Sequence, residues 1–252
     1  MQITADQAYA SLIWSADVAH DDAMLAVIDR SPRLRHVKVD RLYVANNGYS
    51  IFPKLAGQGC NVFYDAKIIE VPSKLEDLAI VECNRARPWM INCMAGSVSG
   101  GPLEDEDPNK IEGLKRFADA CRKVGVRPCA VTVLTSKQSK LFAKENGEFN
   151  GRTAVEQVLY YMEFLLECGF TDVVCSPNEV PAIRAESRFD GLELNTPGIR
   201  RASSSARDQA RTNTPAAALK AGANRLVIGQ DITNGGNPAQ NIEDIVAEIL
   251  AA

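Results

Sequence analysis

Three stretches in the last quarter of the chain carry the strongest signal for its fold. They read Asn-Thr-Pro-Gly-Ile-Arg at 195–200, Asp-Gln-Ala-Arg-Thr-Asn-Thr-Pro at 208–215 and Arg-Leu-Val-Ile-Gly-Gln-Asp-Ile-Thr at 225–233. Glycine lets backbone N–H groups approach an anion closely, and a short helix starting near Asn237 and Pro238 would direct its positive end inward. In a (β/α)8 barrel, the loops after strands 7 and 8 form the usual phosphate cradle. These stretches therefore predict a phosphate site at the mouth of such a barrel.

Outward from these stretches, short apolar segments rich in β-branched residues alternate with amphipathic segments of helical length. This alternation predicts an α/β protein with a parallel sheet, and 252 residues suit one (β/α)8 TIM-barrel domain over residues 1–252. An open doubly wound sheet would alternate in the same way, but no Gly-x-Gly-x-x-Gly follows the first expected strand. Strands are expected at 11–16, 36–39, 61–67, 89–94, 128–134, 172–175, 192–195 and 225–228, and helices at 21–30, 110–123, 152–168, 214–221 and 242–251.

The composition excludes several classes of partner. The formal net charge is −4 with no block of Lys and Arg, so no broad basic surface is available for nucleic acid. No apolar run approaches the ~20 residues of a membrane span, and residues 1–10 lack the pattern of a secretory signal. The seven scattered cysteines predict reduced thiols in a cytoplasm. The two histidines, His20 and His36, are too few for a metal cluster and are expected to be surface or capping residues.

Residues 61–72 read Asn-Val-Phe-Tyr-Asp-Ala-Lys-Ile-Ile-Glu-Val-Pro and place charged side chains at a strand end. Asp65 and Lys67 are two apart, so on a strand their side chains share one face, which at its end points into the barrel mouth. An earlier expected strand contributes Lys38, and Glu70 begins the loop after Lys67. In such an alternating array each carboxylate keeps its lysines charged and each lysine keeps the acids ionised. The motif Asp-x-Lys-x-x-Glu also occurs as an ordinary strand-end salt bridge.

The C-terminal motifs resemble those of the orotidine 5′-monophosphate decarboxylase family in order and spacing. The matching patterns are Thr-Pro-Gly-Ile-Arg at 196–200, Asp-Gln-x-Arg-x-x-Thr-Pro at 208–215 and the Gly-x-x-Ile-Thr close at 229–233. Weaker matches at 15–18, 37–39, 131–136 and 174–179 extend the resemblance over roughly residues 10 to 250.

The resemblance implies a role for each member of the charge array. Lys67 would be the general acid that protonates C6 of the pyrimidine after CO2 leaves, and Asp65 would lie against the departing carboxylate. Lys38 would link that acid to the ribose, and Glu70 would reach across a homodimer into the partner's site. The resemblance also implies a reaction that needs no cofactor. Asp17 would bind a ribose hydroxyl, and Thr135 would lie beside the pyrimidine. The residues implied around the phosphate and its covering loop are Pro197, Arg200, Gln209, Gly229 and Gln230.

Two single residues and two short stretches depart from the family pattern. The last acid of the array is normally Asp, and Glu70 is one methylene longer. Val-Pro-Ser-Lys at 71–74 replaces Ile-Pro-Asn-Thr, and Cys-Met-Ala-Gly at 93–96 replaces a His-Ala-x-Gly-Gly end of the fourth strand. Gln230 replaces an arginine that binds the phosphate. A charged hydrogen bond contributes ~1.5–3 kcal/mol, whereas a neutral one contributes ~1 kcal/mol. The replacement should therefore weaken phosphate binding on the order of tenfold unless another cation compensates. The candidate cations are Arg201, Arg207 and Lys74.

The expected function is conversion of orotidine 5′-monophosphate to uridine 5′-monophosphate and CO2 in pyrimidine synthesis. One alternative is a superfamily relative with another substrate, such as a sugar-phosphate lyase that uses Mg²⁺ and an enediolate. Another is a nucleotide-binding homologue with impaired catalysis. The motifs at 196–200 and 208–215 favour the decarboxylase over the lyases, and Lys38, Asp65 and Lys67 favour an intact catalytic site.

Overall fold

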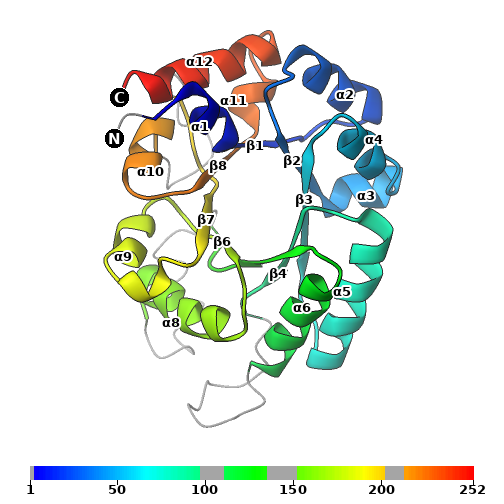
Figure 1. Ribbon diagram of the computed structural model, residues 1–252, viewed down its shortest axis with the longest axis vertical. Helices are drawn as coiled ribbons and strands as arrows, with labels where there is room; N and C mark the ends of the chain where they lie inside the picture. Colours follow the sequence, from blue (N-terminus) through cyan, green and yellow to red (C-terminus); the bar gives the residue numbers. More distant parts are fainter. Residues whose placement is uncertain (1–2, 97–110, 135–151, 202–212) are drawn as a thin grey trace.

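The computed structural model of this chain describes residues 3–96, 111–134, 152–201 and 213–252, and within them eight parallel strands close into a barrel (Figure 1). β1 pairs with β2 on one side and with β8 on the other, which closes the sheet. The predicted (β/α)8 architecture is therefore confirmed. The strands are β1 (Leu12–Ser15), β2 (His36–Asp40), β3 (Asn61–Ile68), β4 (Met90–Met94), β5 (Arg127–Val131), β6 (Asp172–Val174), β7 (Glu193–Thr196) and β8 (Arg225–Ile228).

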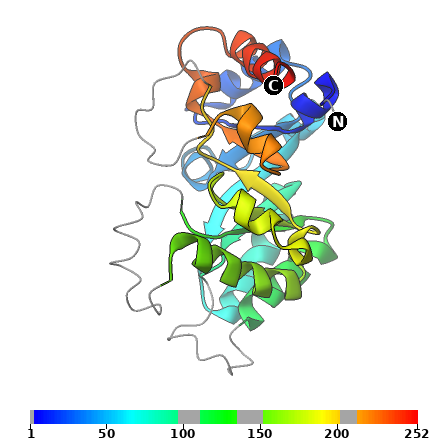
Figure 2. The same ribbon diagram turned by 90° about the vertical axis from the view of Figure 1, so that its left-hand side faces the viewer.

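Helices surround the barrel on the outside (Figures 1 and 2). The chain ends lie close together, where α1 and α12 pack against each other. The described helices are α1 (Ala5–Ala10), α2 (Asp21–Arg30), α3 (Arg41–Asn47), α4 (Ile51–Gly57), α5 (Pro72–Ala86), α6 (Glu112–Lys123), α8 (Ala154–Glu167), α9 (Val180–Arg184), the 3-10 helix η1 (Ser187–Phe189), α10 (Pro215–Lys220), α11 (Gln230–Thr233) and α12 (Pro238–Leu250).

The segment after β8 differs from its prediction. The helix that begins at Pro238 is α12, which is 13 residues long, whereas the short helix is α11, directly after Gly229. Pro238 occupies the first turn of α12, and the Asn237 side chain accepts a hydrogen bond from the backbone N of Ala239. These two capping features start the helix four residues before the expected 242–251 segment, because proline is pre-organised for a first turn and asparagine caps it.

The hydrophobic core has two layers that alternate along the strands. Leu12 and Trp14 belong to the large cluster between strands and helices, whereas Ile13 belongs to a separate small cluster. Successive side chains of a strand point to opposite faces, so the small cluster fills the barrel interior. It consists of Ile13, Phe63, Met90, Cys129 and Val227. The interior is thus packed beneath the mouth.

A charged cluster closes the opposite, amino-terminal end of the barrel. The fully buried Asp172 accepts hydrogen bonds from Arg127 at 2.8 Å and Arg225 at 3.0 Å. His36 is also buried here and packs against Trp89, with ring centroids 4.9 Å apart, so the expectation of a surface or capping role was wrong for this residue. Burial, reinforced by the charge of Arg225, lowers the pKa of His36 to about 4. This end of the barrel thus stabilises the fold, as is usual for the amino-terminal face.

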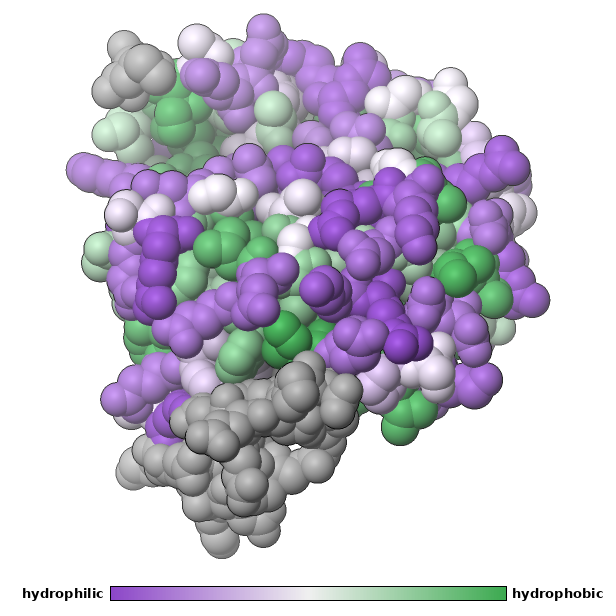
Figure 3. Space-filling model, turned by 60° about the horizontal axis from the view of Figure 1, so that its bottom comes forward, coloured by the Kyte–Doolittle hydropathy of each residue, from purple (hydrophilic) through white to green (hydrophobic). Residues whose placement is uncertain are grey.

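All seven cysteines are free and buried, as expected for reduced thiols. In the described part of the chain, no helix is long and apolar enough to cross a membrane. The face shown in Figure 3 is mainly hydrophilic, with apolar patches scattered between polar side chains.

Candidate active site

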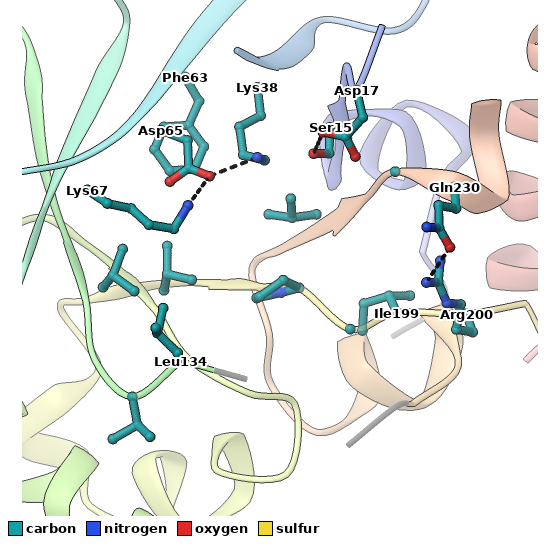
Figure 4. A pocket seen from close by; sticks show the side chains of 17 residues that line it. Ser15, Asp17, Lys38, Phe63, Asp65, Lys67, Leu134, Ile199, Arg200 and Gln230 are labelled. Carbon is teal, nitrogen blue, oxygen red and sulfur yellow. Dashed lines mark hydrogen bonds and ion pairs between the residues drawn. The ribbon is translucent and has the colours of Figure 1, made fainter. Parts of the chain in front are cut away.

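A cavity of about 320 Å³ opens among the carboxyl-terminal ends of the strands (Figure 4). It brings together eight of the residues predicted from sequence, namely Asp17, Lys38, Asp65, Lys67, Pro197, Arg200, Gly229 and Gln230. Its remaining lining is largely apolar, and consists of Ser15, Phe63, Val131, Val133, Leu134, Val174, Gly198, Ile199 and Val227. A polar rim over an apolar floor suits a flat, partly apolar ring that carries charged substituents.

Asp65 is the centre of the charge array. Its Oδ2 accepts hydrogen bonds from Lys38 Nζ at 2.8 Å and Lys67 Nζ at 2.6 Å (Figure 4). Burial would raise the pKa of Asp65, but the charges of both lysines and a hydrogen bond from Asn92 together hold it well below its usual range. Burial would likewise lower the pKa of Lys38, but the Asp65 charge raises it. The site therefore keeps the Asp65 carboxylate and the Lys38 ammonium group charged at neutral pH.

The backbone around Asp65 and Lys67 departs from a regular strand. Tyr64 pairs with Ile91 and Ile68 with Cys93, so four residues of β3 advance alongside two of β4. Lys67 has a φ of +44°, a left-handed conformation that costs a lysine about 1–2 kcal/mol. Such bulges redirect side chains beside active sites. The two side chains do reach one place, as predicted, but the bulge brings them there and not the simple alternation of a strand.

Asn92 on β4 lies opposite this bulge, and sequence reasoning did not identify it. Its Nδ2 donates to Asp65 Oδ1 at 2.7 Å, and its Oδ1 accepts a hydrogen bond from the backbone N of Lys67 at 2.7 Å. The side chain is fully buried and is not among those that line the cavity. A polar residue within an otherwise apolar strand was the only signal in the sequence.

Arg200 and Gln230 form the other end of the cavity. Arg200 Nη2 donates to Gln230 Oε1 at 3.1 Å, and Arg200 Nη1 lies 3.5 Å from Asp231 Oδ1. Gly229 packs closely on β1, since a Cβ on it would lie 2.9 Å from Asp17 Oδ2. Only glycine fits here without displacing Asp17, the residue expected to bind the ribose.

Two of the three candidate replacement cations point elsewhere. Arg201 lies 3.3 Å from Asp244, and Lys74 donates to Asp77 at 3.1 Å on the exposed side of α5. The third candidate, Arg207, lies outside the described residues. Arg200 is therefore the cation that the described structure places beside Gln230.

One further expected site residue, Glu70, is described by the structure and does not line the cavity. Glu70 is exposed, and its Oε2 accepts a hydrogen bond from the backbone N of Val71 at 3.2 Å. The helix α5 begins at Pro72, two residues after Glu70, with Val71 at its N-cap. Thr135 and Gln209 lie outside the described residues.

Comparison with known proteins adds independent information. A model of the "Orotidine 5'-phosphate decarboxylase / HUMPS family" matches residues 10–245. Proteins named orotidine 5'-phosphate decarboxylase from Pseudomonas aeruginosa and Syntrophomonas wolfei are 34% and 31% identical to the chain. These alignments cover 94% and 96% of this chain and 97% and 99% of the relatives. The crystal structure of orotidine 5'-phosphate decarboxylase from Lactobacillus acidophilus shares the fold, with a TM-score of 0.73 and 24% identity over 95% of this chain and 99% of that one.

Proposed function

The chain belongs to the orotidine 5′-phosphate decarboxylase / HUMPS family, and on that premise we propose that it converts orotidine 5′-monophosphate to uridine 5′-monophosphate and CO2. The observation that carries this proposal is the charge array at Asp65, which places two ammonium groups and one carboxylate at one end of the cavity. A cation at the other end, Arg200, suits the phosphate of the same substrate.

The reaction needs a cation beside C6 of the pyrimidine. When the bond from C6 to the carboxylate breaks, CO2 leaves and the electron pair stays on C6 in the ring plane, where the ring carbonyls cannot delocalise it. Lys67 Nζ would stabilise this carbanion electrostatically and then donate the proton that forms the C6–H bond. Lys67 would afterwards regain a proton from solvent, since its side chain is 44% exposed.

The neighbouring residues would fix the substrate around that bond. Asp65 would face the carboxylate that departs as CO2, held in place by Lys38, Lys67 and Asn92. Lys38 and Asp17 both line the cavity on the side of β1 and β2, where they would bind ribose hydroxyls. The apolar floor would hold the pyrimidine.

The phosphate would bind between Arg200 and Gly229. Gln230 accepts a hydrogen bond from Arg200, which orients the guanidinium and leaves the amide nitrogen of Gln230 as a neutral donor to the phosphate. The binding energy of the phosphate would help to close the site around the substrate. That energy would then lower the barrier of the reaction as well as the Kd.

Gln230→Arg should tighten binding of uridine 5′-monophosphate relative to uridine on the order of tenfold. The added guanidinium supplies a charged hydrogen bond in place of a neutral one. Titration calorimetry of both ligands against both proteins gives the ratio of affinities.

Gln58→Arg is the matched control, because Gln58 is an exposed glutamine outside the cavity that donates to Asp29. This variant adds the same charge and should leave the ratio unchanged. An unchanged or lowered ratio in Gln230→Arg would mean that another cation already fills the phosphate site and compensates for Gln230.

We also infer that the active form is a homodimer with shared sites. Glu70 is exposed at the barrel mouth, and the large apolar side chains of Leu42, Ile69 and Val71 are 68%, 62% and 60% exposed at the ends of the paired strands β2 and β3. Large apolar side chains exposed after neighbouring strands support an interface there, because contiguous exposed apolar surface marks interaction sites. Glu70 would then enter the neighbouring site across a two-fold axis.

The Mg²⁺-dependent lyase alternative fits this donor set poorly. Both oxygens of Asp65 already accept hydrogen bonds, Oδ2 from two ammonium groups and Oδ1 from Asn92. Mg²⁺ is bound through carboxylate oxygens, and two ammonium groups beside Asp65 Oδ2 would repel a divalent cation there. Among the described residues, no group of three or more acidic, His or Cys side chains is arranged to hold a metal.

The direct test is the loss of orotidine 5′-monophosphate absorbance with the purified protein, with and without EDTA. Equal rates in both arms support the proposal. A strict Mg²⁺ requirement with a sugar phosphate would favour the lyase, and tight nucleotide binding without turnover would favour the impaired homologue.

A further inference from the structure

We propose that Asn92 is a positioning residue for this reaction, which holds Asp65 and Lys67 in register by bonding to both across the β3–β4 junction. The inference rests on the proposed function. It concerns a residue that is buried outside the cavity and acts only through its two neighbours.

The geometry gives each end of the amide a separate task. Nδ2 donates to Asp65 Oδ1 at 2.7 Å, so it fixes the rotation of the carboxylate whose other oxygen accepts from both lysines. Oδ1 accepts from the backbone N of Lys67 at 2.7 Å. An amide is the side chain that supplies one donor and one acceptor at this spacing without adding charge.

The second bond matters because Lys67 is in a left-handed conformation, with a φ of +44°. A lysine persists in that conformation only where its surroundings determine it. Four residues of β3 run beside two of β4 at this point, so ladder pairing is interrupted from Tyr64 to Ile68. Asn92 supplies a side-chain acceptor to the Lys67 N–H inside this interruption, and thereby sets where the Lys67 side chain leaves the strand.

Asn92→Ala should lower kcat on the order of 10²-fold, the effect expected when a reacting group is misplaced by about 1 Å. The Kd of uridine 5′-monophosphate should stay near its native value, because neither Arg200 nor the apolar floor depends on Asn92. A parallel loss of nucleotide binding, or a kcat close to native, would overturn the proposal.

Asn92→Asp is isosteric and separates the two tasks. One oxygen can still accept from the Lys67 N–H, but the other would face Asp65 Oδ1 at hydrogen-bond distance, and two such carboxylates share a proton. The acidic limb of kcat/KM should therefore move to higher pH than in the native protein. The other titratable groups around Asp65 are Lys38, Lys67, the Cys129 thiol, Asp40 on the neighbouring strand and Asp17 in the same cavity, and all of them are the same in the variant as in the native protein. An unshifted limb would contradict the Asp65 contact.

Asn224→Ala is the matched control. Asn224 Oδ1 likewise accepts a backbone hydrogen bond between neighbouring strands, from Leu194 N at 2.7 Å, but at the amino-terminal end of the barrel. This variant should lose stability without a change in kcat or in the pH profile. An equal loss of kcat in Asn224→Ala would show that the effect of Asn92 is only structural.

A readout that needs no turnover separates this inference from the proposed function. In protein labelled with 15N-lysine, the Lys67 amide is the signal that disappears in Lys67→Arg. Its exchange with deuterium should be slow in the native protein and in Asn224→Ala, and fast in Asn92→Ala. If the native protein does not decarboxylate orotidine 5′-monophosphate, the proposed function fails while this exchange still tests the positioning. Equal exchange in all three proteins would overturn the inference even in an active enzyme.

Discussion

Lys67→Ala should lower kcat for decarboxylation at least ~10⁴-fold, because it removes both the general acid and the cation beside the developing carbanion. Binding of uridine 5′-monophosphate should change little, since the product needs no proton and its phosphate is held at the Arg200 end of the cavity. Absorbance assays over hours, with product affinity measured by calorimetry, give both quantities.

Lys54→Ala is the matched control for this variant. Lys54 is 49% exposed where Lys67 is 44% exposed, and each donates to an aspartate at 2.6 Å. Lys54 lies on α4 and outside the cavity, so its removal should leave kcat unchanged. Near-native turnover in Lys67→Ala would remove this lysine from the mechanism.

Mixing two inactive variants should restore activity if Glu70 acts in the neighbouring subunit. Homodimers of Lys67→Ala and of Glu70→Ala should each be nearly inactive. After the two are refolded together, about half the dimers are mixed, and in each of these one site carries both lesions and the other none. Activity should then approach about one quarter of the native value per subunit.

The competing account is local. Glu70 accepts a hydrogen bond from Val71 N, the residue that caps α5, and an acid at a helix start is stabilising there. If this is its whole role, Glu70→Ala loses only stability and stays active, and the mixture recovers no more than the Glu70→Ala subunits supply. If Glu70 acts within its own subunit, the mixture stays at background. Sedimentation of the native protein as a monomer would contradict the shared site before any mixing.

The strand and helix pattern predicted a parallel α/β sheet, because each amphipathic segment must bury one face against the sheet. The chain length, the missing dinucleotide motif and the C-terminal motifs then favoured a barrel over an open sheet. The charge array was also accessible from sequence, since Asp65 and Lys67 are two apart and Lys38 lies on the neighbouring strand. The motifs then predicted which loops meet at the mouth, and Arg200, Gly229 and Gln230 do line the same cavity.

The finer geometry could not be predicted, for physical reasons. The β3 bulge depends on register with β4, which no local propensity specifies, so the left-handed Lys67 and the role of Asn92 stayed hidden. The Arg200–Gln230 hydrogen bond joins the segment after β7 to the first residue of α11, 30 residues away, and follows from tertiary packing. The burial of His36 was not predicted, because its ring packs against Trp89, which directly precedes β4 and is distant in sequence.

The central claim is that this chain replaces the C6 carboxylate of orotidine 5′-monophosphate with a proton, and proton NMR in D2O with EDTA tests it most directly. The enzyme from Pseudomonas aeruginosa serves as a control for the substrate. The account predicts uridine 5′-monophosphate whose H5 signal is a singlet, because the proton on Lys67 exchanges with solvent and C6 receives deuterium. Failure to form this product while the control enzyme forms it, or its formation only after Mg²⁺ is added, would contradict the account.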